Sequence, residues 1–152
     1  MIVTDLDILH RSSTEARLKE GQDIGRKLIK EFKVFQETHK DLVVVGLAAP
    51  QIGLNKRVFF ALGEVFINPK PINFSTNNSV SYEGCCSLDG CYEVRRLCSL
   101  SMRWINGAGQ LCHKRFEGNM AAIMFHELDH LDGKLISDIG TKVEKPPTMK
   151  SK

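Results

Sequence analysis

Two histidines and one glutamate near the C-terminal end of the chain have the spacing of a metal-dependent catalytic site. His126 and His130 are four residues apart and Glu127 follows the first of them, in the segment Phe-His-Glu-Leu-Asp-His-Leu-Asp-Gly at 125–133. On a helix such residues lie on one face, one turn apart, so both imidazoles can bind one metal ion. Glu127 can then accept a proton from a water molecule at that metal. The alternative is that the histidines only pack within a satisfied core, because a motif this short also occurs by chance.

A catalytic metal site needs a third protein ligand and leaves one position for water. After His130 the sequence contains no further histidine, and its one glutamate, Glu144, lies in a Pro- and Lys-rich tail. We therefore look upstream, where the segment Glu-Gly-Cys-Cys-Ser at 83–87 places two adjacent cysteines in a turn-like context. A thiolate from this pair is the best candidate for the third ligand.

The metal-binding segment is predicted to be a buried amphipathic helix. Apolar residues recur through it at three- and four-residue spacing, namely Met120, Ile123, Met124, Leu128 and Leu131. Gly133 is placed to end this helix at its C′ position.

A second helix is predicted near the N-terminus, over residues 12–38, after a short extended lead at 1–11. Ser12 and Glu15 have the S-x-x-E spacing of a capping box. Apolar residues then recur at helical spacing, namely Ile24, Leu28, Phe32 and Phe35.

The middle of the chain is predicted to form strands. Apolar segments indicate strands at 42–45, 57–62 and 65–67, and the polar stretch 73–80 is predicted to be a loop. The clearest alternation places one set of side chains on one face of a strand, namely Cys98, Leu100, Met102 and Trp104. The turn at 106–109 should return this strand into 110–116 as a hairpin. Hairpin-linked strands with a late catalytic helix predict an α+β fold.

The composition is that of an ordinary soluble domain. The chain has 152 residues, 42% of them hydrophobic and 26% charged, which suits one domain with a sizeable core. Its net charge of +3 is too small and dispersed to indicate binding to DNA or other nucleic acid. We find no apolar run of membrane-spanning length and no signal peptide. Five cysteines, an odd number, then favour reduced thiols and a cytoplasmic location.

Three separated motifs resemble those of the peptide deformylase family. Gly46–Gln51 (Gly-Leu-Ala-Ala-Pro-Gln) is similar to the first motif, Glu83–Ser87 to the second and His126–His130 to the third, in the family's order and spacing. The resemblance covers about residues 5–138 and indicates a compact member with a very short C-terminal tail. It implies antiparallel sheets packed around a central metal-binding helix, plus an N-terminal helix. We expect a single catalytic domain at 1–140 and a disordered tail at 141–152.

The resemblance also implies which residues act in the site. Cys85, His126 and His130 would bind one divalent metal ion, natively Fe²⁺, in a site that Zn²⁺, Ni²⁺ or Co²⁺ can also occupy. Glu127 would be the catalytic base. Asp129 is predicted to support the site by pairing with an arginine such as Arg96.

Further residues are implied to contact the substrate. Gln51 and the backbone N–H of Cys86 would stabilise the oxyanion. Cys86 departs from the family, which usually has Leu here, but a backbone donor does not depend on its side chain. Gly46 would leave room for a substrate bound as an added strand. A mostly apolar pocket for the methionine side chain would be lined by Val45, Ala122 and Ile123.

The implied function is removal of the N-formyl group from the N-terminal formylmethionine of newly made polypeptides, with release of formate. The partner is therefore an N-formylmethionyl nascent peptide, and we expect a monomer without DNA or membrane partners. Bacterial relatives carry a longer C-terminal helix implicated in ribosome docking. Little of this chain follows Ile139, so we do not expect ribosome association by that route.

Two rival functions would use the same residues. A zinc endopeptidase would share the two histidines and the glutamate base and would cleave internal peptide bonds, but the expected downstream ligand is absent from the sequence. A closed structural zinc site would use both histidines with Cys85 and Cys86, and it would leave Glu127 without a role.

Overall fold

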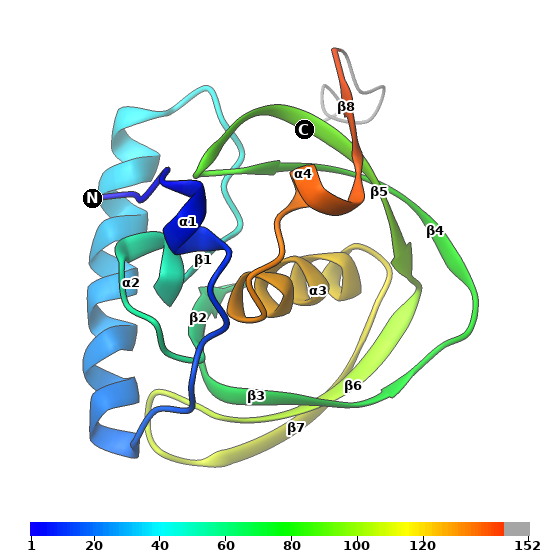
Figure 1. Cartoon of the computed structure of the whole chain (residues 1–152). Coiled ribbons are helices and arrows are strands. Elements are labelled where there is room, and N and C mark those ends of the chain that lie inside the picture. The colour runs from blue at the N-terminus through cyan, green and yellow to red at the C-terminus, as the bar shows by residue number, and fades with distance from the viewer. Residues whose placement is uncertain (145–152) are drawn as a thin grey trace.

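The computed structural model of the chain describes residues 1–144, which form two antiparallel sheets with helices between and beside them (Figure 1). The first sheet has the strand order β1-β2-β3-β6-β7 and the second has the order β4-β5-β8. The strands of the first sheet are β1 (Gly46–Ala48), β2 (Val58–Ala61), β3 (Glu64–Phe74), β6 (Ser99–Ile105) and β7 (Leu111–Glu117). Those of the second are β4 (Asn78–Cys85), β5 (Leu88–Leu97) and β8 (Thr141–Val143). The helices are α1 (Leu6–Leu9), α2 (Leu18–Thr38), α3 (Asn119–Leu131), α4 (Ile136–Ile139) and the short 3₁₀ helix η1 (Ala49–Ile52).

The five-stranded sheet is covered by a helix on each face. Phe59 and Phe66 pack with α3 in one core cluster, whereas Val58 and Ile67, their neighbours in sequence, pack with α2 in a second cluster. Successive side chains of a strand point to opposite faces, so both faces of β2 and of the first half of β3 are buried. This two-sided burial explains why these strands read as continuous apolar runs in the sequence.

Helix α3 occupies the centre of the molecule, between the two sheets (Figure 1). It packs against β1, β2 and β7 of the first sheet and against β5 of the second. The helix ends where predicted, because Gly133 has a φ of +74° and a Cβ there would lie 2.5 Å from the carbonyl oxygen of His10. The predicted α+β fold, with antiparallel sheets around this helix and an N-terminal helix, is confirmed.

The predicted alternation on β6 is also confirmed. Leu100, Met102 and Trp104 are buried against α3, and β6 pairs with β7 throughout. The turn between them is held by Asn106, whose side-chain oxygen accepts from the backbone N–H groups of Ala108 and Gln110. Met120 is a partial exception to the predicted buried stripe of α3, since it is half exposed.

The predicted start of the N-terminal helix at residue 12 is wrong. Helix α2 begins at Leu18, and the backbone N–H of Arg17 bonds to the side chain of Glu20. Ser13 is used elsewhere: its backbone N–H donates to Leu131 O at the end of α3. The segment 1–11 is not simply extended either, because it contains α1.

Two predictions in the middle of the chain are also wrong. The apolar segment 42–45 is not a buried strand, since Val43 is 63% exposed and β1 starts only at Gly46. The polar stretch 73–80 is mostly strand rather than loop, because β3 runs to Phe74 and β4 starts at Asn78. In the second place, backbone pairing of β3 with β6 and of β4 with β5 overrides the polar composition of the segment.

The C-terminal boundary differs from the prediction as well. Residues 141–143 were expected in a disordered tail, but they form β8, which pairs with β5 and satisfies its outer backbone groups. Glu144 follows β8, and residues 145–152 of the predicted tail lie outside the described residues. Within residues 1–144 no helix is both long and apolar enough to cross a membrane.

Candidate active site

Helix α3 presents the two histidines and Glu127 to the β4–β5 hairpin. The imidazole rings of His126 and His130 have their centroids 5.1 Å apart. Glu127 and His130 are each only 2% exposed. The spacing read from the sequence therefore forms one buried polar face on an otherwise apolar helix.

The β4–β5 hairpin brings Cys85 to this face. Cys85 ends β4 and pairs with Leu88, so Cys86 and Ser87 form a two-residue turn between them. The Sγ atom of Cys85 lies 3.5 Å from Nε2 of His130. Single ligand atoms of Cys85, His126 and His130 lie within 4.8 Å of one another. We call these three residues the ligand cluster.

The ligand cluster fits a divalent metal ion. One thiolate and two imidazoles are ligands that such ions accept, and three protein ligands leave a position for water. Within residues 1–144 no other group of His, Cys, Asp and Glu side chains is close enough to hold a metal. Beside the cluster, Oε1 of Glu127 is buried without a hydrogen-bond partner in the described part of the chain. A buried carboxylate oxygen in this state is available to a water molecule at the open position.

A buried ion network fixes the orientation of His126. Arg96 of β5 donates two hydrogen bonds to the carboxylate of Glu83, at 2.9 and 2.8 Å, and a third to Asp129 at 2.6 Å. Oε1 of Glu83 also lies 2.9 Å from Nδ1 of His126. With Nδ1 engaged, the Nε2 atom of His126 is the one left for a metal. The predicted pairing of Asp129 with Arg96 is confirmed.

The network keeps Glu83 ionised. Burial acts to raise the pKa of Glu83, but the hydrogen bonds from Arg96 and His126 and their charges outweigh it and lower that pKa to about 2. The Glu83 carboxylate therefore stays a hydrogen-bond acceptor at any physiological pH. Sequence analysis assigned no role to Glu83, although its place two residues before Cys85 puts both side chains on one face of β4.

Glu127 has the electrostatic environment of a proton carrier. Burial raises the pKa of Glu127 to about 7, which suits a group that takes up and releases a proton near neutral pH. Gly46 approaches it closely, since a Cβ at this position would lie 2.6 Å from Oε2 of Glu127. A side chain at position 46 would therefore collide with the Glu127 carboxylate.

The side chain of Gln51 lies against Cys85 of the ligand cluster. Its side chain is 2% exposed, and its Nε2 lies 3.4 Å from Sγ of Cys85. Cys86 points elsewhere: its side chain packs against the core cluster beneath α2. Burial, with the charges of Cys85 and Glu127, raises the pKa of the Cys86 thiol to about 12.

The remaining predicted substrate residues are neighbours of these groups in the sequence. Val45 is 43% exposed and directly precedes β1 and Gly46. Ala122 is buried one turn before His126, and Ile123 is partly buried against the core around α3.

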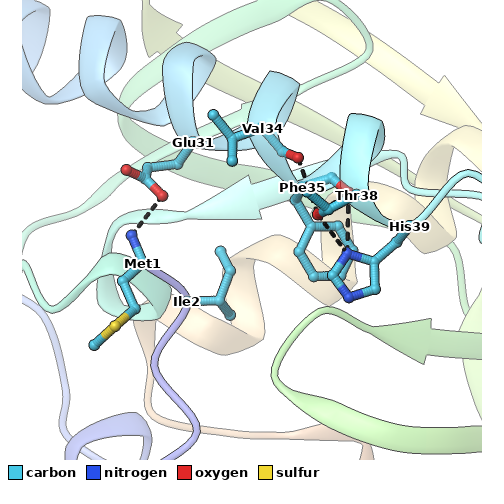
Figure 2. Close-up of a pocket in the computed structure, with 7 residues that line it drawn as sticks. All are labelled: Met1, Ile2, Glu31, Val34, Phe35, Thr38 and His39. Carbon is cyan, nitrogen blue, oxygen red and sulfur yellow. Dashed lines mark hydrogen bonds and ion pairs between the residues drawn. The ribbon is translucent and has the colours of Figure 1, made fainter.

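A separate surface hollow of about 320 Å³ lies between the N-terminus and the end of α2 (Figure 2). It is lined by Met1, Ile2, Glu31, Val34, Phe35, Thr38 and His39. None of the predicted site residues lines it, and it contains no cluster of metal ligands.

Comparison with known proteins places the chain in one family. The family model for polypeptide deformylase matches residues 2–145. A peptide deformylase of Clostridium botulinum is 37% identical over 131 residues, which cover 83% of this chain and 88% of the relative. The crystal structure of a probable peptide deformylase from Synechococcus phage S-SSM7 has a TM-score of 0.79 at 30% identity, covering 91% of this chain and 98% of that one. Peptide deformylase from Thermotoga maritima has a TM-score of 0.75 at 28% identity, covering 96% and 97%.

The Cys-His-His ligand cluster suits a metal-dependent hydrolase, which is the class of the matched family. The chain belongs to the polypeptide deformylase family. The resemblance seen in the three sequence motifs is confirmed, and the family's catalytic divalent metal has a suitable ligand cluster here.

We predict that Arg96→Met destabilises the metal-free protein strongly. Removing the guanidinium leaves Glu83 and Asp129 buried without their partner, which lowers the free energy of unfolding by about 3 kcal/mol. Urea denaturation measures this change. The control is Arg26→Met, which removes an exposed ion pair with Asp23 and should change the stability by less than about 1 kcal/mol. Equal losses in the two variants would contradict a structural role for the Arg96 network.

Proposed function

We propose that this chain hydrolyses the N-formyl group of N-terminal formylmethionine in newly made polypeptides and releases formate. The observation that carries the proposal is the ligand cluster beside the buried, unpartnered carboxylate oxygen of Glu127. The family and the names of its members support the same reaction. By this proposal the partner is an N-formylmethionyl nascent peptide, and the enzyme works as a monomer in the cytoplasm. Residues 1–140 would be its single catalytic domain.

We infer that Cys85, His126 and His130 hold the metal and that Fe²⁺ is the native ion, with Zn²⁺, Ni²⁺ and Co²⁺ as substitutes. A mixed thiolate and imidazole set accepts all four, so the ligands alone do not select iron. When bound, the ion supplies Lewis-acid chemistry, polarising the formyl carbonyl and favouring ionisation of the attacking water.

Glu127 would move the proton. It accepts a proton from the attacking water, whose oxygen bonds to the formyl carbon. As the bond between that carbon and the amine nitrogen breaks, Glu127 returns the proton to the nitrogen, so a free amine and formic acid leave, and the acid releases its own proton to the solvent as formate. Its pKa of about 7 supports both acceptance and return at neutral pH.

Gln51 and the backbone N–H of Cys86 would stabilise the negative charge on the formyl oxygen. The position of Gln51 Nε2 near Cys85 Sγ, at 3.4 Å, supports this role for the amide. A neutral amide donates a hydrogen bond without bringing a competing proton.

The substrate backbone would add to the first sheet along β1. In the described sheet β1 pairs only with β2, so its other edge can accept an extended peptide. Gly46 would allow that peptide to approach Glu127. The methionine side chain would contact Val45, Ala122 and Ile123.

The zinc endopeptidase alternative is not favoured. That function expects its third ligand downstream of the helix, whereas the third side chain of the ligand cluster comes from the upstream hairpin. The closed structural zinc site is not favoured either, because the side chain of Cys86 packs into the core instead of joining the cluster.

The direct test of the proposal is formate release from a formyl-Met peptide. We expect the metal-loaded enzyme to release formate and to leave an internally quenched peptide without a formyl group uncleaved. We expect the iron form, purified without oxygen, to turn over faster than the zinc form. Cleavage of the quenched peptide without formate release would refute the deformylase function.

A second prediction concerns the base. Glu127→Gln keeps the size and hydrogen bonding of the side chain but cannot accept a proton, so turnover should fall on the order of a hundredfold or more. Metal content, measured by elemental analysis, should remain near one ion per chain. Loss of metal together with activity would mean that Glu127 is a ligand.

A third prediction separates the adjacent cysteines. Cys85→Ser should lose most of its metal, because a neutral hydroxyl is a much poorer ligand than a thiolate. Cys86→Leu is the matched control and should keep its metal and most of its activity, since the side chain faces the core. Metal content and formate release are measured on both variants, purified alike without oxygen. If Cys86→Leu lost its metal while Cys85→Ser kept it, the ligand would be Cys86 and not Cys85.

A further inference from the structure

We propose that Ser87 is a positioning residue that orients the side-chain amide of Gln51 for catalysis. The inference rests on the proposed function, in which Gln51 donates a hydrogen bond to the formyl oxygen. Ser87 is the last residue of the second sequence motif, and its position in the sequence alone indicates no role.

The oxygen end of the Gln51 amide is fixed by the backbone. The N–H of Ala48 donates to Oε1 of Gln51 at 2.9 Å, in a fully buried hydrogen bond. A backbone N–H can only donate, so it must face the carbonyl oxygen of the amide and not its nitrogen. The NH₂ group of Gln51 is therefore directed to the opposite side, toward the β4–β5 hairpin.

The nitrogen end of the amide is held by that hairpin. Nε2 of Gln51 donates to Oγ of Ser87 at 3.2 Å and contacts Sγ of Cys85 at 3.4 Å. The amide has two N–H groups. With one on Ser87, the other points to the side of the metal ligands, where the reacting carbonyl must lie. The Ser87 hydroxyl is a stronger acceptor than the Cys85 sulfur, because sulfur accepts hydrogen bonds only weakly.

The hydrogen bond between Gln51 and Ser87 is shielded from solvent. Ser87 is 5% exposed and Gln51 is 2% exposed, so bulk water cannot take the place of the hydroxyl. Without Ser87 one N–H of the amide would lose its acceptor, and the amide would turn to recover a hydrogen bond. A donor that has turned away from the developing oxyanion stabilises it less.

One short segment supplies both a metal ligand and the hydroxyl that orients Gln51. Cys85, Cys86 and Ser87 lie at the tip of the β4–β5 hairpin, so a single turn supplies a ligand and the group that aims Gln51. The position of the oxyanion donor is thereby tied to the position of the metal ligand.

The test is a double-mutant cycle of Ser87→Ala and Gln51→Ala, with formate release as the assay. We expect Ser87→Ala to lower kcat about tenfold with KM nearly unchanged, a smaller loss than the hundredfold or more typical of removing an oxyanion donor itself. In the Gln51→Ala background the same substitution should have no further effect. Equal losses of kcat in both backgrounds, or an unchanged kcat in Ser87→Ala, would overturn the inference.

A second readout does not depend on activity. The two side-chain amide protons of Gln51, assigned in NMR spectra by their absence in Gln51→Ala, should shift in Ser87→Ala and stay near their original positions in Ser87→Thr, which keeps a hydroxyl. The matched control is Ser13→Ala, which removes a similarly buried hydroxyl bonded to Asn55 outside the site and should leave these signals in place. Unshifted Gln51 signals in Ser87→Ala would overturn the inference.

The two readouts also separate this inference from the proposed function. Absence of formate release by the unmodified enzyme would refute the proposed function and the inference with it. Normal formate release by the unmodified enzyme and by Ser87→Ala would overturn the inference alone. If Ser87→Ala does not fold, the test uses Ser87→Thr, which keeps a hydroxyl. A large loss of kcat in Ser87→Thr while the Gln51 amide signals stay unshifted would overturn the inference.

Discussion

The buried ion network of Arg96 is the interaction on which the site geometry depends. Arg96 lies on the second sheet, yet it joins Glu83 of the neighbouring strand to Asp129 of the central helix. Through Glu83 it reaches the Nδ1 atom of His126. The ligand cluster is assembled from two separate segments, β4 and α3, so their relative position must be fixed before a metal can bind. The Arg96 guanidinium, bonded to two carboxylates, fixes this relative position, because its planar N–H groups can donate to a carboxylate only in a narrow range of geometries.

The first sheet supplies the other half of the framework. Its strand β2 and the first half of β3 are buried on both faces, with α3 packed on one face and α2 on the other. Gly46 and Gln51 lie at the edge of this sheet, whereas Cys85 and Ser87 belong to the hairpin of the second sheet. The site therefore forms where the two sheets meet around one helix, and neither sheet could assemble it alone.

The sequence was most informative where a pattern is local. The spacing of His126 and His130, the alternation on β6 and the stop at Gly133 each follow from the geometry of a single element, and all three were predicted. The start of α2 was missed because Ser13 bonds to the end of α3, a contact between residues far apart in sequence. The strand that ends at Phe74 was missed because pairing with β6 overrides local composition. The roles of Glu83 and Ser87 depend on partners from other elements, which no spacing reveals.

The N-terminal segment is built into the back of the site. The N–H of Val3 donates to the carbonyl oxygen of Gln51, and the N–H of Ser13 donates to that of Leu131. Val3 finds its partner early in the chain, whereas Ser13 finds this partner only when the end of α3 has been made. Docking of the N-terminal segment onto α3 is therefore a late and non-local step of folding. The hydrogen bond between Ser13 and Leu131 can form only after α3 has left the ribosome.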